Sequence, residues 1–207
     1  MKLSIFASLV ASAAAFAPAT TKTSSAVVTQ AAKDDLIAVA EKSNPVLKYY
    51  DPLQLASTTI WGETNEATIG FLRHAEVKHG RVAMAAFVGY IVQSNGLHFP
   101  FPIDFAGNPY PYAAGSPPEQ WDALSDPAKW QILLFIGFLE WFSEAAGTHY
   151  MRGGKPGDFP NFSDNKDLIP HPVPLNLFDP FGLSAKKSEA QKAEGLIKEL
   201  NNGRLAQ

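Results

Sequence analysis

Residues 76–83 read E-V-K-H-G-R-V-A, and residues 199–206 repeat this pattern as E-L-N-N-G-R-L-A. Each copy places a glutamate three positions before a histidine or an asparagine, and a glycine and an arginine follow. On a helix, residues three positions apart lie on the same face, about one turn from each other. The pattern therefore predicts two helices, each with a pair of potential metal ligands on one face and an arginine beyond them.

A second repeated segment precedes each of these copies. Residues 51–55 read D-P-L-Q-L, and residues 179–183 read D-P-F-G-L. Either segment alone is an ordinary Asp-Pro turn, begun by Asp51 or by Asp179. Together with the two helical copies, they predict two related structural units around an unrelated middle segment.

Length and composition narrow the class of protein. The chain has 207 residues, a formal net charge of −3 and no cysteine. This length corresponds to one domain or slightly more. The charge gives no reason to expect nucleic acid binding, and the lack of cysteine excludes a disulfide scaffold, a zinc-thiolate site and a cysteine nucleophile.

The N-terminus has the composition of a targeting sequence. Residues 1–15 begin with a basic residue, continue with an apolar stretch and end in a small-residue cleavage site, as a signal peptide does. Residues 16–32 lack acidic residues and are rich in Ser, Thr and Ala, as transit peptides are. This order resembles the bipartite plastid presequence of algae with red-derived secondary plastids; the alternative is a secreted protein with a flexible N-terminus. Residues 33–207 are the predicted folded domain.

The sequence predicts helices and no strands. We expect a short helix over residues 34–42 and longer helices over about 67–93, 127–146 and 185–207. Asp126 is the predicted N-cap of the third of these, with Pro127 in its first turn. The proline-rich and glycine-rich segments between the helices are predicted loops.

The predicted helix 67–93 poses a question about membranes. Its apolar half falls short of the roughly 18 uncharged residues that mark a span, yet 27 helical residues extend for about 39 Å and exceed a hydrocarbon core of about 30 Å. Its charged half fits within a bilayer only if the charges are paired or ligated. If the two repeat helices face each other, Glu76 meets Arg204 and Glu199 meets Arg81, and the glycine of each copy permits close approach.

Each potential ligand also has an ordinary interpretation. Taken singly, His79 is a core or surface histidine, Glu76 a solvated charge and Arg81 a surface cation. The repetition of the same spacing argues against these interpretations. Glu-x-x-His also occurs in di-iron bundles, but a second copy is needed there, and the second copy here has Asn202. An amide oxygen suits Mg²⁺ better than iron, so separate magnesium sites of the kind chlorophyll needs are favoured.

The two copies with their preceding turns resemble the light-harvesting chlorophyll-binding superfamily. Residues 130–140 look like the central helix of its fucoxanthin chlorophyll a/c branch, and the resemblance extends over about residues 44–206. It implies an all-α membrane protein with the three-helix light-harvesting fold, whose two repeat helices cross as an X in a thylakoid membrane. It also implies that the two Asp-Pro turns clasp carotenoids.

The resemblance also implies a set of pigment-binding residues. By similarity, chlorophyll magnesium has axial ligands at Glu76, His79, Glu140, Glu199 and Asn202, Gln131 matches a further ligating position, and Arg81 and Arg204 are the interhelical ion-pair partners. A carboxylate such as Glu140 among apolar residues is costly without a partner. The alternative for Glu140 is a solvated place near the membrane surface.

The implied function is that of a light-harvesting antenna protein and not of an enzyme. Such a protein binds chlorophyll a, chlorophyll c and fucoxanthin or a related carotenoid, and transfers excitation energy to a photosystem. The implied partners are thylakoid lipids, a photosystem core and other antenna subunits, in homo- or hetero-oligomers. The alternatives are a photoprotective family member with Asp104, Glu119 and Asp122 as candidate pH sensors, a di-iron oxidase, and a soluble secreted structural protein.

The C-terminus differs from the pattern of this superfamily. Its members continue the third helix with a long apolar run after the arginine, whereas this sequence stops at Gln207. Residues 184–207 are polar and cannot span a bilayer by themselves. We therefore expect a third helix that is truncated, either because the sequence is incomplete or because it is a natural variant.

Overall fold

The computed structural model describes residues 25–169 and 176–207, which form helices and no strands. Its α-helices are α2 (Ser25–Ser43), α3 (Asn65–Ser94), α4 (Pro117–Asp122), α5 (Asp126–Ala145) and α6 (Glu189–Ala206). Single 3-10 turns occur at Leu55–Ser57, Tyr112–Ala114, Tyr150–Arg152, Phe162–Asp164 and Ser184–Lys186. The prediction of an all-helical chain is confirmed. The predicted signal peptide and the first part of the transit-like segment lie outside the described residues, and residues 25–32 form the start of α2.

The long helices lie where the sequence places them, and their ends differ for local reasons. The predicted helices 67–93 and 127–146 are α3 and α5, within two residues at each end. The last helix begins at residue 189 and not at 185, because Ser188 caps it. The Ser188 hydroxyl accepts a hydrogen bond from the backbone N–H of Gln191, whose side chain accepts one from the Ser188 N–H. The short helix predicted over 34–42 is part of the longer α2.

The predicted N-cap of α5 is wrong. Ser125 is the N-cap, and Asp126 is already in the first helical turn. The Ser125 hydroxyl does not bond to the helix backbone but donates to Asp104 Oδ2 at 2.6 Å. A hydrogen bond from a distant loop thus takes the place of local capping, which residue order alone does not indicate.

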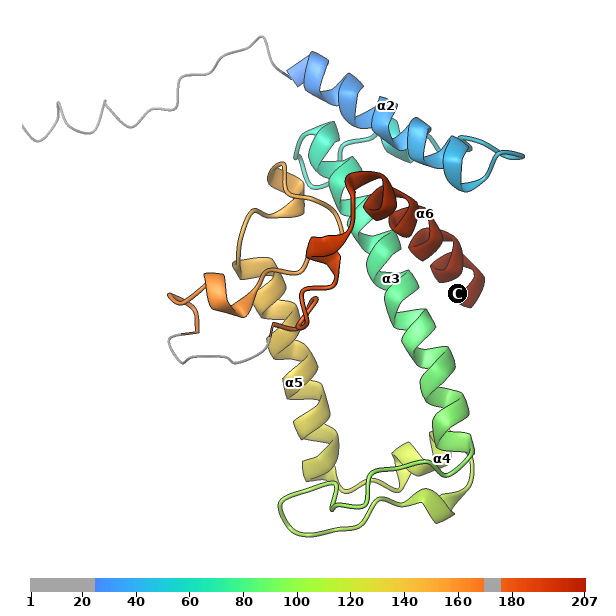
Figure 1. Ribbon diagram of the computed structural model, residues 1–207, viewed down its shortest axis with the longest axis vertical. Coiled ribbons are helices and arrows are strands. Elements are labelled where there is room, and N and C mark those ends of the chain that lie inside the picture. Colours follow the sequence, from blue (N-terminus) through green and yellow to red (C-terminus); the bar gives the residue numbers. More distant parts are fainter. Residues whose placement is uncertain (1–24, 170–175) are drawn as a thin grey trace, which may run out of the picture.

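The helices are arranged around α3 (Figure 1). The first half of α3 packs against α2 and α6, and the segment after α5 also contacts it. The far ends of α3 and α5 are joined by a long loop that contains α4 (Figure 1). Residues distant in sequence therefore meet at one end of the molecule, where the two repeats lie.

Buried apolar side chains also gather at this end. Val77 and Leu200 are buried between α3 and α6, and Phe142 forms a cluster with Ala146 and Phe162. The remaining lengths of α3 and α5 expose large apolar side chains: Val82, Phe87, Val88, Tyr90 and Ile91 of α3, and Trp130, Leu133, Leu134, Phe135, Ile136, Phe138 and Trp141 of α5. Among the described residues, no helix combines the length and the apolar character that a membrane span requires.

The two Asp-Pro segments form the same turn. Asp51 accepts hydrogen bonds from the backbone N–H groups four and five positions later, at 2.9 and 3.0 Å. Asp179 accepts from the equivalent N–H groups, both at 2.6 Å. The fourth residue of each turn is left-handed, with φ 53° at Gln54 and 65° at Gly182. A 3-10 turn follows in both cases, so the sequence repeat is also a repeat of local structure.

Candidate functional site

Two reciprocal ion pairs join α3 to α6. Glu76 Oε1 lies 2.7 Å from Nε and 2.6 Å from Nη2 of Arg204. In the equivalent pair, Nε of Arg81 donates to Oε1 of Glu199. Each arginine therefore reaches the glutamate of the other copy, as the sequence predicts. Both ion pairs use Oε1, and neither Oε2 atom has a recorded hydrogen-bond or ion-pair partner among the described residues.

The glycines of the two copies bring the helix backbones together. A Cβ atom built on Gly80 lies 3.0 Å from Cα of Gly203, and one built on Gly203 lies 2.9 Å from Cα of Gly80. A Cβ on Gly203 would be closer than real Cβ atoms come to a neighbouring atom, and one on Gly80 would force its neighbour to shift. Glycine at both positions is therefore required for this approach, which lets the two arginines span the interface.

The remaining residues of the two copies occupy equivalent environments. Val77 and its counterpart Leu200 are both buried. His79 and its counterpart Asn202 are both exposed. Each copy therefore buries its aliphatic residue and leaves its second potential ligand exposed.

Each arginine also makes a hydrogen bond outside the repeats. Arg81 Nη1 donates to the backbone oxygen of Gly157, in the segment that follows α5. Arg204 Nη1 donates to Oγ of Ser43 at 3.0 Å, at the end of α2. Asn201 Nδ2 donates to the backbone oxygen of the same serine at 3.1 Å. The ion pairs thus anchor two further segments, which sequence reasoning did not find.

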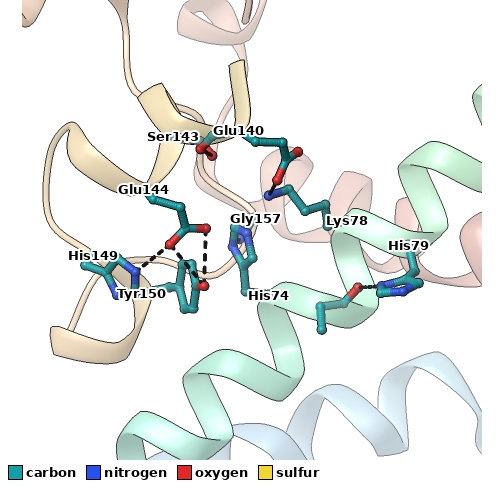
Figure 2. Close-up of polar contacts among 10 residues, drawn as sticks. His74, Lys78, His79, Glu140, Ser143, Glu144, His149, Tyr150 and Gly157 are labelled. Atoms are coloured by element: carbon teal, nitrogen blue, oxygen red, sulfur yellow. Dashed lines mark hydrogen bonds and ion pairs between the residues drawn. The ribbon is translucent and has the colours of Figure 1, made fainter. Parts of the chain in front are cut away.

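The ring of His79 is held by a hydrogen bond to the preceding turn of α3. Its Nδ1 lies 2.7 Å from the backbone oxygen of Ala75, so Nδ1 donates, and in the neutral ring Nε2 is the nitrogen with the lone pair. Histidines that bind metals are commonly held by such a bond to the second ring nitrogen. Figure 2 shows the bond between the His79 ring and the preceding turn of α3.

An apolar groove of about 760 Å³ lies beside His79. Its walls come from α3, from Glu140 of α5 and from the end of α6: Lys78, His79, Val82, Ala83, Ala86, Phe87, Tyr90, Ile91, Glu140, Ala206 and Gln207. A concave, largely apolar surface with a few polar groups is the usual form of a ligand site. The groove therefore suits a large apolar ligand that lies against His79.

The structure places Glu140 and Gln131 differently along α5. Glu140 is exposed, and its Oε2 lies 2.5 Å from Nζ of Lys78, so it bridges α5 to α3 (Figure 2). Gln131 is partly buried, and its Nε2 is buried without a hydrogen-bond partner among the described residues. A buried amide without a partner is uncommon and fits a ligand that accepts its hydrogen bond.

The comparison with known proteins identifies the family. Residues 38–207 match the family described as "Chlorophyll A-B binding protein". The chain belongs to this family. It is 37% identical to the fucoxanthin-chlorophyll a-c binding protein F of Phaeodactylum tricornutum, over all of this chain and 90% of the relative. It is 36% identical to the fucoxanthin-chlorophyll a-c binding protein of Trieres chinensis, over all of this chain and 89% of the relative.

Membership of the chlorophyll a-b binding family also decides between an antenna protein and the two alternatives from other classes of protein. The proteins of this family are pigment-binding antenna proteins and not enzymes, so the di-iron oxidase and the secreted structural protein are set aside. Within the described residues, the helices also bring together no group of three His, Asp or Glu side chains suited to a metal ion.

A histidine that sequence reasoning overlooked connects α3 to the segment after α5 (Figure 2). His74 is 9% exposed, and its Nδ1 accepts a hydrogen bond from the N–H of Gly157 at 3.2 Å. Its ring stacks on Tyr150 with 3.9 Å between centroids. Gly70, His74 and Val77 lie at helical spacing, and the backbone of Tyr150 would contact a Cβ on Gly70 at 2.5 Å. The same spacing continues to Arg81 of the first repeat. It could have indicated which face of α3 contacts the segment after α5.

Tyr150 in turn reaches the end of α5. Its hydroxyl donates to Glu144 Oε2 at 3.2 Å, and the same carboxylate oxygen lies 2.7 Å from Nε2 of His149. Burial, followed by the charge of Glu144, raises the pKa of Tyr150 to about 12. The tyrosine therefore stays protonated and holds the end of α5 against α3.

Two of the three candidate pH sensors do not have the properties of a sensor. Asp104 accepts hydrogen bonds from Ser125 and from the side chain and backbone of Asn108, which lower its pKa to about 2. The backbone N–H and the hydroxyl of Ser116 both donate to Glu119 and lower its pKa. These hydrogen bonds favour the charged form of both carboxylates, which argues against a role for either residue in sensing mildly acidic pH. For Asp122 this role stays a prediction.

The pKa of Asp104 predicts how the stability of the loop depends on pH. Because the folded value of about 2 lies below the ordinary 3.8, the carboxylate stabilises the fold fully above the ordinary value. This contribution is lost as the pH falls through the folded value. We expect Asp104→Asn to lower the melting temperature by a constant amount above about pH 4, and the difference to shrink toward pH 2. Thermal unfolding followed by circular dichroism across this range measures it; a difference that changes between about pH 5 and 7 would contradict it.

Proposed function

We propose that this chain is a chloroplast light-harvesting antenna subunit that binds chlorophyll a, chlorophyll c and fucoxanthin or a related carotenoid. The observation that carries the proposal is His79, whose Nδ1 is occupied by the oxygen of Ala75 and whose Nε2 is left free beside an apolar groove. Membership of the chlorophyll a-b binding family supports the same ligand, as do relatives named for fucoxanthin and chlorophylls a and c.

The repeat residues supply a consistent set of further ligands. When bound, chlorophyll would supply visible absorption and a magnesium ion that accepts a ligand atom from the protein. Glu76 and Glu199 each hold an arginine through Oε1, so Oε2 remains to ligate a magnesium while the arginine neutralises the charge. Asn202 is exposed at the position equivalent to His79. Glu140 and Gln131 would be the pigment ligands on the central helix, α5. Lys78 of α3 neutralises the charge of Glu140.

The apolar surfaces of α3 and α5 support a membrane location. Both helices expose a long series of large apolar side chains, whereas soluble monomers rarely expose such patches. Pigments and thylakoid lipids would cover these surfaces. We propose that α3 and α6 cross as an X, and that the turns at Asp51 and Asp179 hold carotenoids. The family's association with photosystems suggests a photosystem core and other antenna subunits as partners, in an oligomer.

Substitution of the histidine tests the pigment assignment. We expect His79→Ala to lose a single chlorophyll from the reconstituted complex, because no other side chain of that turn faces the groove with a free nitrogen. His98→Ala is the matched control, since it removes an exposed histidine of the loop that contains Asp104. Pigment extraction and chromatography give the chlorophyll content per chain. An unchanged content in His79→Ala would refute the assignment.

A further inference from the structure

The loop between α3 and α4 presents a cluster of exposed apolar side chains. Leu97, Phe99, Phe101 and Phe105 are 62%, 75%, 61% and 99% exposed, and we call them the aromatic loop surface. The rings of Phe99 and Phe101 stack with 5.2 Å between centroids. The loop lies at the end of the molecule opposite α2 and α6 (Figure 1). Groups of large apolar side chains this exposed mark an interaction surface.

The loop directs its charge inward. Asp104 is the one charged residue of residues 96–118 if histidine is counted as neutral, and it is buried next to the fully exposed Phe105. It accepts four hydrogen bonds, from the backbone N–H of Ala106, the backbone and side chain of Asn108, and the hydroxyl of Ser125. The loop therefore presents aromatic side chains without an accompanying charge.

A second buried polar group fixes the loop to the helix end. Gln120 of α4 is 2% exposed, and its Nε2 donates to the backbone oxygens of Gln93 at 3.2 Å and of Gly115 at 2.8 Å. The hydroxyl of Tyr110 donates to its Oε1 at 3.2 Å. Gln93 lies in the last turn of α3, so the aromatic loop surface is held at the end of this helix and is not a flexible tether.

We propose that the aromatic loop surface inserts into the interfacial layer of the lipid bilayer and sets the depth of α3 and α5. Three features select lipid over a protein partner: the surface carries no charge, it consists mainly of aromatic rings, and its loop joins the ends of the two helices that expose large apolar side chains (Figure 1). Aromatic side chains favour the layer between headgroups and hydrocarbon. This inference rests on the membrane location proposed above.

The absence of cysteine allows a direct test with single spin labels. Phe105→Cys places the label on the aromatic loop surface, Phe135→Cys places it on the exposed face of α5, and Lys166→Cys places it on the exposed connection after α5. Each pigmented full-length variant is reconstituted into vesicles of phosphatidylcholine and phosphatidylglycerol. Power saturation then compares collisions with oxygen, which concentrates in lipid, and with a nickel chelate, which stays in water.

We expect the label at residue 105 to collide more with oxygen than with the nickel chelate, and the label at 166 to show the reverse. A label at 105 that behaves like the one at 166, while 135 stays protected from nickel, overturns the inference and leaves the proposed function intact. Nickel access at 135 as well would contradict the membrane location and the inference together. Protection of 105 from both reagents would point to a protein partner and also overturn the inference.

Discussion

Gly203→Ala is expected to destabilise the pigmented protein by about 1–3 kcal/mol, because its Cβ would lie 2.9 Å from the backbone of Gly80. The helices would then separate, and both ion pairs across the interface would lengthen. Gly195 lies in the same helix, and a Cβ there meets no atom within 4 Å. Gly195→Ala is therefore expected to stabilise the helix by about 0.5–1 kcal/mol, since alanine favours helix over glycine.

Comparing Gly203→Ala with Gly195→Ala separates the effect of the contact between the two helices from the effect of alanine on helix propensity. Both substitutions gain the same propensity, so the difference between them reports the contact at the interface. Gly80→Ala and Gly89→Ala repeat the comparison in α3, where a Cβ at Gly89 also meets open space. Thermal unfolding followed by the loss of pigment circular dichroism measures all four. Equal stability of Gly203→Ala and Gly195→Ala would show that the helices do not approach through these glycines.

Breaking one ion pair is expected to be nearly as damaging. Arg204→Ala removes the cation that binds Glu76 and should cost about 1–2 kcal/mol, because the carboxylate loses a charged hydrogen bond at a pair that is partly exposed to solvent. Lys198→Ala is the control in the same helix, since Lys198 pairs with Glu194 in solvent and an exposed pair contributes less than about 1 kcal/mol. Urea unfolding of the reconstituted complexes gives both values.

Exchanging the charges of Glu76 and Arg204 separates the role of Glu76 in the ion pair from its proposed role as a ligand. Glu76→Arg combined with Arg204→Glu restores the ion pair in reverse and should recover most of the lost stability. An arginine cannot ligate magnesium, so the exchanged protein should still lack the chlorophyll assigned to Glu76. A double variant as unstable as Arg204→Ala would contradict the pairing. One with full pigment content would contradict the ligand assignment.

The paired repeats explain how a chain with a small core builds a site for large apolar ligands. The ion pairs, the glycines and the buried Val77 and Leu200 join α3 to α6 at one end. The remaining surfaces of α3 and α5 stay uncovered by protein. Polar pairing therefore supplies the fixed geometry, and the exposed helices supply the apolar area that pigments and lipids would cover.

Local patterns in the sequence were sufficient to predict much of this arrangement. The long helices, the two Asp-Pro turns and the residues of both ion pairs follow from spacing and repetition, because the spacing fixes which side chains of a helix share a face and the repeat pairs the glutamate of one copy with the arginine of the other. The capping of α5 was predicted wrongly, since Ser125 bonds to Asp104 and not to its own helix. Local rules describe a cap only when no distant partner takes the capping side chain.

The sequence by itself determined the long helices, the two Asp-Pro turns and the spacing of the residues in both ion pairs, because these depend on neighbours within about two helical turns. Only the tertiary structure decided how Lys78 reaches Glu140, how Gly157 bonds to both His74 and Arg81, and how Gln120 fixes the aromatic loop. These contacts join residues far apart in the chain through segments without periodicity. Their geometry depends on the path of the connecting loops, and no spacing in the sequence specifies that path.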